Sequence, residues 1–444
     1  MVHDTLILGG ELGLWVTLLM AGWGAVVSFV GAAMDRGDLQ TSGRRASYVA
    51  AASALVAVCG LVNALVAHDF ALEYVAQYSN ASLSTALAVS AVWAGPAGAL
   101  LVGICLTAIM AAWTVAGEND PRDRATAHLT GGVSALVFIA TLVLVAVGRP
   151  YSRLAWLAAD GAGLDPMLRH VAPAAGGLIL LCAYAAGAMA VAFAATAHTS
   201  GQAARMWRPR VHRWTLAAWT GASLGIGLLL RGAYLHSGVA GLWWPAEGMK
   251  AAGVFWLAAS AALHITGRRE PKRPGRVGET VAHAGVAIAA VALVAGAFAG
   301  SQSAVLRTGQ AVPARDMFGR AWTLIGQGVS QYSAADRAVT AVSLNAAPGA
   351  AAGAGIGPLL VARQLSYGNA DDTVATSIEV EPAIVHTALG DLRVVVESVA
   401  DDAARVRVSV VPFAWAFWFG ALLTVIGGAA ALVFDATASN AEAA

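Results

Sequence analysis

Long apolar runs alternate with short polar segments along most of this 444-residue chain. A run of about 20 apolar residues is long enough to cross a bilayer as a helix. Runs of this kind are found near residues 11–33, 47–67, 97–116, 125–147, 174–198, 211–233, 249–268, 280–300 and 410–434. The pattern therefore predicts an all-α polytopic membrane protein with about nine transmembrane helices.

The segment between the last two apolar runs has a different pattern. Residues 301–409 contain stretches such as LRVVVESV and RVRVSVVP, in which apolar and polar positions alternate as they do in β-strands. The stretch NAAPGAAAGAGIGP is so rich in Gly and Ala that it predicts a flexible loop. We expect a helical bundle over 1–300, a small β-rich extracytoplasmic domain over 301–409, and a final helix with a cytoplasmic tail over 410–444.

The basic residues predict how the helices are oriented. The loops DRGDLQTSGRR, ENDPRDR, RMWRPRVHR and GRREPKRPGR alternate with loops poor in Lys and Arg. By the positive-inside rule these four loops are cytoplasmic, so the N-terminus is outside and the C-terminus inside a bacterial or archaeal cytoplasmic membrane. The bundle then has outer loops at 68–96, 148–173 and 234–248. The first apolar run lacks the basic start of a cleaved signal peptide, which favours a retained anchor.

Composition excludes several classes of protein. The chain is 58% hydrophobic and only 12% charged, which is not the profile of a soluble globule. A net charge of +1 gives no sign of a nucleic-acid partner. The three cysteines lie in apolar stretches, without a CxxC or CxxCH motif, so the chain is predicted to be neither a thiol oxidoreductase nor a c-type cytochrome itself.

Two histidines are the strongest candidates for chemistry. His264 comes just before the basic loop GRREPKRPGR, and His283 comes just after it. In an antiparallel hairpin both imidazoles would lie at nearly the same depth, roughly one helical turn inside the basic edge. A titratable side chain inside a bilayer is costly and indicates function, and two imidazoles at one depth can ligate a haem iron from both sides. Hydrogen bonding between helices is the alternative role. The neighbours that would leave room for a porphyrin are Ala261, Ala262, Ala282, Ala284 and Gly285.

The outer loops hold a second group of candidates. Trp243 and Trp244 are either part of an interfacial aromatic belt or a shelf on which a haem plane lies. His236 and, less directly, His170 are either external haem ligands or exposed loop residues. Arg231 either snorkels to the interface or pairs with a haem propionate. The remaining histidines are predicted to lie at span ends, for His128 and His198, or at the surface, for His3, His68, His212 and His386.

A series of short motifs points to one protein family. They are EYVAQYSN and SAVWAGPAG within Phe70–Gly98, GLDPMLR at Gly163–Arg169, Tyr184, the set Trp256, Leu257 and His264, AHAG at Ala282–Gly285, LGDLRVVV at Leu389–Val396, and PFAWAFWFG at Pro412–Gly420. In this order they resemble the CcmF family of cytochrome c biogenesis. That family belongs to the haem-handling membrane proteins, including the CcsA type, that carry a tryptophan-rich WWD segment.

The resemblance implies a function. The chain would be a haem lyase component, a holocytochrome c synthase-like activity, that holds a transmembrane haem b between His264 and His283. Its outer face, with Trp243 and Trp244, would meet an apocytochrome c whose CxxCH thiols add to the haem vinyl groups. Haem-delivery and thiol-handling maturation proteins, quinol and membrane lipids are the implied partners. No catalytic residue is assigned.

Three departures from the family pattern leave an alternative open. Family members are longer, with extra helices and an outer histidine between the two transmembrane histidines. The family's other outer histidine has no counterpart at the matching position, which aligns near Gly176 of this chain. The WWD segment is reduced to LWWPAE at 242–247, without the aspartate. The alternative is a degenerate paralogue that acts as a membrane haem b electron-transfer or scaffold subunit without ligation activity.

Overall fold

The computed structural model describes residues 2–443 except 118–122, 156–159, 200–203, 238–246, 268–275, 297–300, 316–320, 335–336, 349–358, 368–376, 388–389 and 401–402, and in some elements it describes the backbone alone. The chain divides into two compact units. The first unit comprises residues 1–229, 247–279 and 425–444, and the second comprises 230–246 and 280–424.

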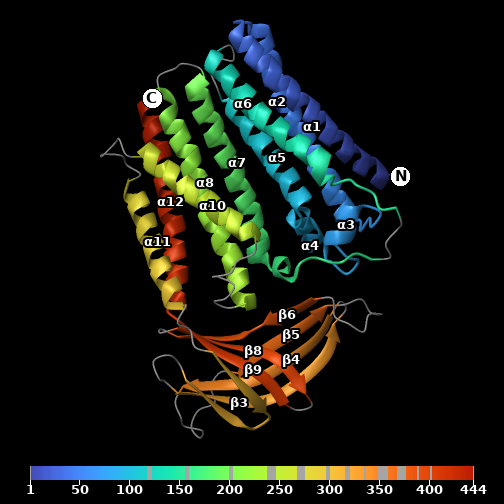
Figure 1. Cartoon of the computed structure of the whole chain (residues 1–444), viewed down its shortest axis with the longest axis vertical. Coiled ribbons are helices and arrows are strands. Elements are labelled where there is room, and N and C mark those ends of the chain that lie inside the picture. The colour runs from blue at the N-terminus through green and yellow to red at the C-terminus, as the bar shows by residue number, and fades with distance from the viewer. Residues whose placement is uncertain are drawn as a thin grey trace. The chain divides into compact units, whose positions relative to one another are not determined.

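The first unit is a bundle of long helices. They are α1 (Val2–Ala33), α2 (Gly37–Val66), α5 (Pro96–Ala116), α6 (Arg124–Val143), α7 (Val171–Thr199), most of α8 (Ala204–Ser237) and α10 (Glu247–Gly267). α1 and α2 run side by side as a pair (Figure 1). Large apolar side chains lie both in the core, such as Leu61 and Leu101, and on the exposed surface, such as Leu19 and Trp113. Helices that are apolar on every side are typical of a protein surrounded by lipid.

Small and hydroxyl side chains let these helices pack closely. A Cβ on Gly60 of α2 would lie 2.6 Å from the Cα of Gly10 in α1, so only glycine fits at this crossing. Further along the same pair, the hydroxyls of Thr17 and Ser53 lie 2.8 Å apart. Small residues and hydroxyl pairs of this kind hold helices together in membranes, where apolar surface alone gives little drive for association.

The helices account for most of the predicted spans. Among the described residues, seven helices are long and apolar enough to cross a membrane. Two shorter apolar stretches, Ala251–Leu263 and Val277–Ala292, overlap the predicted spans 249–268 and 280–300. The chain is therefore a multi-pass membrane protein. The exact count of nine spans stays a prediction.

The predicted outer loops 68–96 and 148–173 contain short helical elements that contact one another. These are α3 (Glu73–Tyr78), α4 (Thr85–Ser90), η1 (Ala91–Trp93) and η3 (Pro166–Arg169), while η2 (Leu144–Gly148) continues α6 to the start of the second loop. The Tyr74 hydroxyl donates to the Val92 carbonyl at 2.8 Å and accepts from the Gly95 amide at 3.0 Å. Gly163 takes a φ of +87° while its amide donates to the Ser79 carbonyl at 3.0 Å. The EYVAQYSN and GLDPMLR motifs thus bind each other.

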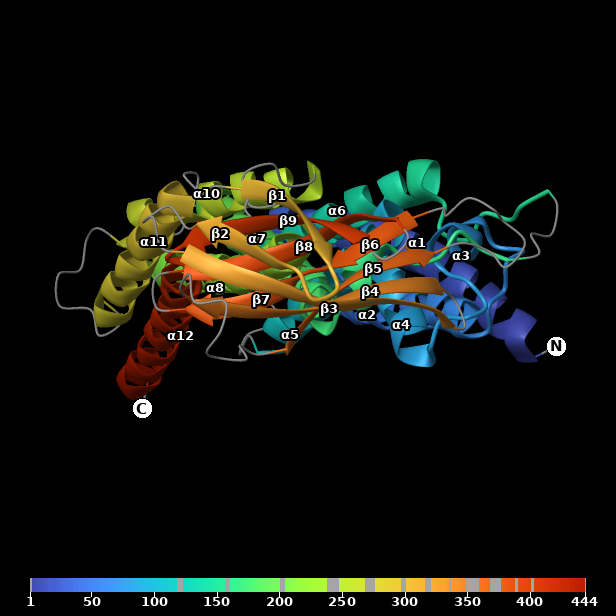
Figure 2. The same ribbon diagram turned by 90° about the horizontal axis from the view of Figure 1, so that it is seen from below.

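The second unit is built around a β-sandwich. Its strands are β1 (Ser301–Arg307), β2 (Ala311–Arg315), β3 (Ala321–Ala334), β4 (Arg337–Pro348), β5 (Leu359–Tyr367), β6 (Ser377–Glu381), β7 (Ala383–Thr387), β8 (Gly390–Ala400) and β9 (Ala403–Pro412). They form two antiparallel sheets of order β1-β9-β8-β7 and β2-β3-β4-β5-β6 (Figure 2). Leu324 and Leu344 of one sheet share a single apolar core with Leu392 and Val394 of the other.

Two boundaries differ from the sequence prediction. Asn345–Pro348, predicted to start a flexible loop, instead continue β4 and pair with 322–325 of β3. Leu324 and Ala346 are both in the sandwich core, which shows why small apolar residues suffice there. The remainder of that predicted loop, 349–358, lies outside the described residues. The span predicted from 410 also begins later, because 410–412 still belong to β9 and α12 covers Ala414–Ala443.

Candidate functional site

The helix that carries His264 is fixed to α8 by a reciprocal pair of tryptophans. The rings of Trp256 in α10 and Trp219 in α8 stack with centroids 5.8 Å apart. Each indole N–H donates to a serine of the other helix at 2.8 Å, Trp256 to Ser223 and Trp219 to Ser260. The tryptophan that matched the family motif therefore sets the position of α10. The side chain of His264 itself lies outside the described residues.

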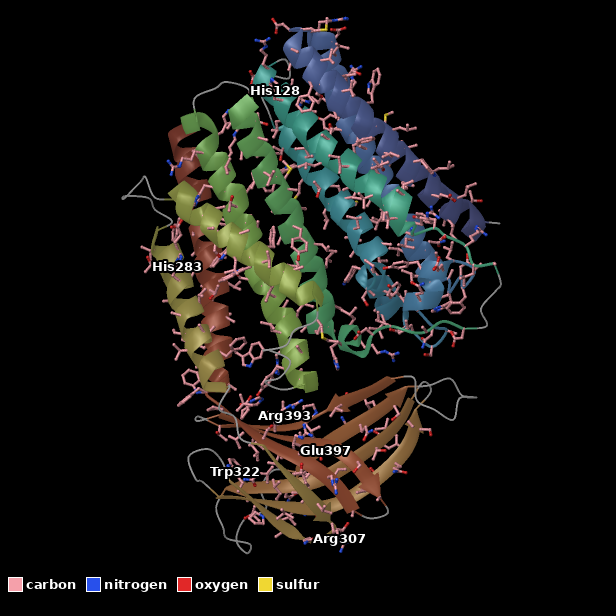
Figure 3. All side chains as sticks on the ribbon, viewed as in Figure 1. His128, His283, Arg307, Trp322, Arg393 and Glu397 are labelled. Atoms are coloured by element: carbon pink, nitrogen blue, oxygen red, sulfur yellow. The ribbon has the colours of Figure 1, made fainter. Side chains whose placement is uncertain are left out.

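His283 lies on the exposed side of α11 (Arg276–Gly296), away from α12 (Figure 3). The opposite side of α11 packs tightly on α12, because a Cβ on Gly285 would lie 2.5 Å from the amide nitrogen of Thr424. Ala282 is buried in the same contact, and its carbonyl accepts from the Thr424 hydroxyl at 3.5 Å. Thr280, Ala284 and Ala287 are exposed near His283. One side of α11 therefore packs closely on α12, and the other side carries the His283 imidazole among small side chains.

The outer candidates divide between the two units. Arg231 is half-buried near the end of α8, with its guanidinium 5.6 Å from the ring centroid of Trp418 in α12. This cation–π contact holds the Arg231 guanidinium against an aromatic ring of the second unit. His170 follows η3 in the first unit and is half-buried. Trp243, Trp244 and the side chain of His236 lie outside the described residues.

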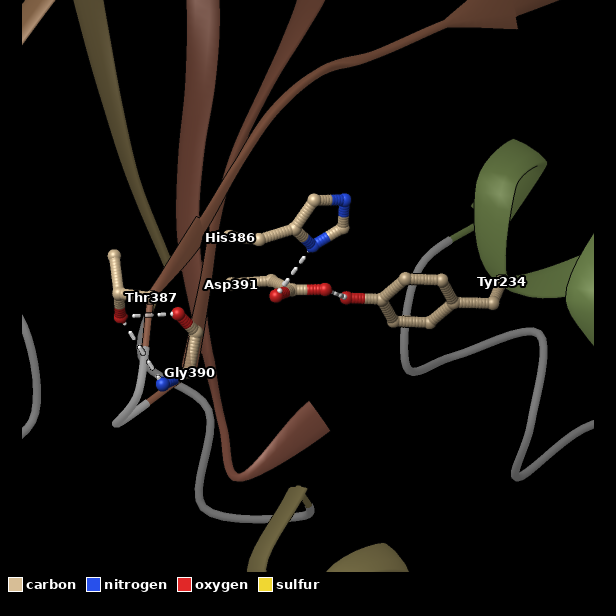
Figure 4. A network of polar contacts seen from close by, with 5 residues as sticks. All are labelled: Tyr234, His386, Thr387, Gly390 and Asp391. Carbon is tan, nitrogen blue, oxygen red and sulfur yellow. Dashed lines mark hydrogen bonds and ion pairs between the residues drawn. The ribbon is translucent and has the colours of Figure 1, made fainter. Parts of the chain in front are cut away.

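A polar network lies on one face of the four-stranded sheet (Figure 4). Asp391 of β8 accepts a hydrogen bond from the Tyr234 hydroxyl of α8 at 3.0 Å and lies 2.9 Å from Nδ1 of His386 in β7. Tyr234 and Asp391 are almost completely buried, 1% and 3% exposed. The sequence predicted His386 at the surface. Its ring is indeed exposed, but one nitrogen is held by a buried carboxylate.

Arg393 joins α8 to the same sheet face. Its Nη2 donates to the Leu235 carbonyl at 2.9 Å. Burial lowers the pKa of the Arg393 guanidinium from its usual value, although an arginine remains charged at neutral pH. Asp391 and Arg393 alternate with the core residues Leu392 and Val394, so one face of β8 is polar and buried beneath α8. The alternation in GDLRVVV was the only sequence signal for this face.

One histidine lies elsewhere than predicted. His212 of α8 was expected at the surface but is only 2% exposed, with Nε2 3.4 Å from a carboxylate oxygen of Glu279 in α11. A charged or strongly polar pair is the usual way to accommodate such groups inside a helical bundle. Among the described residues, no group of three or more His, Cys, Asp or Glu side chains could hold a metal ion.

Comparison with known proteins gives consistent relatives. The chain is 29% identical to the cytochrome c-type biogenesis protein CcmF of Haemophilus influenzae and 32% identical to CcmF of Pseudomonas aeruginosa, in each case over 57% of this chain and 39% of the relative. It is 32% identical to the probable cytochrome c-type biogenesis protein NrfE of Escherichia coli over 44% of this chain and 36% of the relative. The chain thus spans about two fifths of the length of these curated relatives. No family model matches.

The fold has a solved counterpart. A structure described as "Cytochrome c Heme Lyase CcmF" superposes with a TM-score of 0.70 at 15% sequence identity, covering 96% of this chain and 98% of that one. At this identity the likeness concerns the fold, while the curated relatives carry the likeness in sequence. This chain is therefore related in sequence to the CcmF and NrfE cytochrome c biogenesis proteins, and it shares the fold of a CcmF haem lyase.

Proposed function

We propose that this chain is a haem lyase component of cytochrome c biogenesis that holds a haem b between His264 and His283. The observation that carries the proposal is the exposed imidazole of His283 on an apolar helix. A titratable side chain on an apolar membrane helix is costly and is a functional-site hypothesis by default. The relatives named for cytochrome c biogenesis and the fold named for haem lyase support haem as the partner of this imidazole.

The described half of this site fits a haem. α11 has 21 residues and is about 31 Å long, enough to cross the hydrocarbon core. Exposed Thr280, Ala284 and Ala287 leave a shallow surface next to His283, where a larger side chain would hold a flat macrocycle away. Close packing of Gly285 on α12 fixes the height of the imidazole. A haem ligated by two histidines supplies electron transfer without an open iron position.

The proposed reaction is attachment of haem to an apocytochrome c. In it, each thiol of a CxxCH motif adds across a haem vinyl group, with sulfur bonding to one carbon and a hydrogen to the other, so the addition itself consumes no electrons. The iron must be ferrous for clean attachment, which is the role we propose for the electrons of the haem b site. The β-sandwich of the second unit would be extracytoplasmic and would meet the apocytochrome and the maturation proteins that deliver haem and reduced thiols.

Quinol is the electron donor that we propose. The first unit has a hollow of about 460 Å³ between α3, α5 and the end of α6, within the range of small-molecule sites. Its wall combines hydrogen-bonding groups with apolar side chains, as a quinol head and its tail require. The lining includes Glu73, Gln77, Tyr78, Arg149, Ala97, Leu100 and Val147. Filling the hollow by Ala97→Phe should slow haem reduction by quinol but not by dithionite; equal slowing of both would remove the hollow from the pathway.

The proposed haem b site is tested by spectroscopy of the purified protein. We expect a b-type signal in the reduced-minus-oxidised and pyridine haemochrome spectra of the wild type and its loss in both His264→Ala and His283→Ala. His128→Ala is the matched control, because His128 lies in another membrane helix, half-buried against the Phe29 ring. Wild-type protein without haem, or an unchanged spectrum in His283→Ala, would overturn the proposal.

One observation favours a second function. The reduced segment LWWPAE lacks the aspartate of the WWD pattern that the CcmF family carries. The chain would then be an electron-transfer or scaffold subunit that holds haem b without ligation. Deleting the gene separates the two functions: normal levels of c-type cytochromes would favour the subunit, and their loss with haem b biosynthesis intact would favour the lyase.

A further inference from the structure

An exposed histidine at the edge of the β-sandwich is held by a buried carboxylate. The side chain of His386 is 68% exposed, whereas that of Asp391 is 4% exposed, and the Nδ1-to-Oδ1 distance is 2.9 Å. The pair is set by the backbone, because His386 of β7 and Asp391 of β8 are register partners in an antiparallel ladder. Partners in such a ladder project from the same face of the sheet.

A second group fixes the carboxylate. The Tyr234 hydroxyl donates to the other oxygen of Asp391 at 3.0 Å, and Tyr234 is 1% exposed. Tyr234 is itself packed against Trp418, with ring centroids 5.8 Å apart. Two donors from two different elements therefore hold the carboxylate, so it cannot rotate away from the imidazole without breaking a buried hydrogen bond.

This arrangement determines which nitrogen of His386 is available. An ionised carboxylate only accepts hydrogen bonds, so in a neutral imidazole the proton lies on Nδ1 and the lone pair on Nε2. In Figure 4 the second ring nitrogen points away from Asp391. Histidines that bind metals in proteins commonly donate their other N–H to a carboxylate in this way, which fixes the tautomer and makes the ligand more basic.

The surroundings indicate what kind of metal centre fits. A bare divalent ion needs three or more protein ligands, and no such group is present among the described residues. A haem iron needs only one or two axial ligands. Ile384 projects from the same face of β7 as His386 and packs in one apolar cluster with Tyr234, Val411 and Trp418. Arg231, on Trp418, brings a guanidinium of the kind that pairs with carboxylates.

We propose that Nε2 of His386 is an axial ligand to the iron of the haem that this protein processes, with Asp391 and Tyr234 as positioning residues. The proposal rests on the proposed function for the identity of its ligand. It assigns a second haem position, separate from the His264 and His283 pair, and it places the substrate haem on the sandwich. An imidazole held by a carboxylate would bind the iron axially and leave the edge of the porphyrin accessible for reaction.

The first experiment isolates this position. Purified full-length His283→Ala protein, which lacks the proposed haem b ligand, is titrated with ferric protoporphyrin, and the Soret band is followed for the shift that imidazole ligation causes. We expect the additional change His386→Ala to weaken binding at least tenfold and abolish the shift, and added imidazole to restore the spectrum. His68→Ala is the control, because His68 lies in the loop after α2, in the other unit.

The second experiment tests the positioning residues. Asp391→Asn keeps the shape of the side chain but makes the ligand less basic, so we expect ten- to hundred-fold weaker haem binding and a higher midpoint potential. Tyr234→Phe removes a donor that withdraws charge from the carboxylate, so it should shift the potential in the opposite direction and by less. A purely structural role would lower stability and leave the potential of the remaining bound haem unchanged, and that result would remove Asp391 and Tyr234 from the site.

The outcomes separate this inference from the proposed function. Equal affinity and spectrum with and without His386 would overturn the inference, even if wild-type protein keeps its b-type signal. If wild-type protein lacks a b-type haem but binds ferric protoporphyrin through His386, the haem b proposal fails and the inference stands. Loss of ligation in the His68→Ala control to the same extent as in His386→Ala would also overturn the inference.

Discussion

The buried hydrogen bond between Tyr234 and Asp391 gives the sharpest prediction of stability. Tyr234→Phe removes only the hydroxyl. The ring keeps its place against Trp418 and in the apolar cluster with Val411, so the buried apolar area hardly changes. The measured loss would therefore report the hydrogen bond to the carboxylate alone.

The magnitude follows from the burial of the carboxylate. Asp391 is 3% exposed and has two described partners, so the variant leaves a buried charge with His386 as its remaining donor. A hydrogen bond to a charged group contributes about 1.5–3 kcal/mol. At 1.36 kcal/mol for each factor of ten, this corresponds to opening of the local structure that is about 10- to 150-fold more frequent.

Hydrogen–deuterium exchange with mass spectrometry measures that opening directly. Amide exchange in peptides from β7 and β8 should accelerate by this factor in Tyr234→Phe, because local opening controls exchange. The control is Tyr332→Phe in β3, whose side chain is half exposed and whose loss should leave exchange unchanged. Exchange in β7 and β8 within twofold of wild type would refute the energetic role of this bond. Equal acceleration in both variants would show that the effect is not specific.

Two further predictions concern the helices and the outer loop. Gly285→Val should lower the melting temperature in detergent, because a Cβ at this position would meet the backbone of α12 and overpacking costs about 1–3 kcal/mol. Gly253→Ala is the control and should leave the melting temperature unchanged, because a Cβ there would have nothing within 4 Å. An unchanged melting temperature in Gly285→Val would contradict the close packing. Burial raises the pKa of the Tyr74 phenol, so the neutral phenol stabilises the folded protein. This contribution to the free energy of unfolding is complete below the ordinary phenol pKa of about 10 and is lost as pH rises above it. Alkaline unfolding curves should therefore be shallower for Tyr74→Phe, and an identical alkaline slope would contradict the raised pKa.

Local sequence signals predicted the elements well where a single pattern governs a whole element. Hydropathy runs found the long helices because a bilayer requires about 20 apolar residues in succession. Alternation found β8 and β9 because side chains in a strand project alternately to two faces. The Gly- and Ala-rich criterion failed at Asn345–Pro348, where pairing with β3 and the apolar core of the sandwich decided the conformation.

The site shows the same division between local and distant information. His283 could be selected from sequence because a histidine inside an apolar run is unusual wherever the chain folds. His386 and His212 could not, because their partners are chosen by contacts across elements: Asp391 is oriented by Tyr234, 157 positions earlier in the chain, and His212 of α8 meets Glu279 of α11.

The sequence by itself therefore determined the class of protein, the course of its helices and strands, and its resemblance to cytochrome c biogenesis proteins, because hydropathy, strand alternation and short motifs are properties of neighbouring residues. Only the tertiary structure decided which face of α11 carries an exposed imidazole and which nitrogen of His386 is available. Those choices depend on helix packing and strand register, which bring together side chains that no local pattern relates.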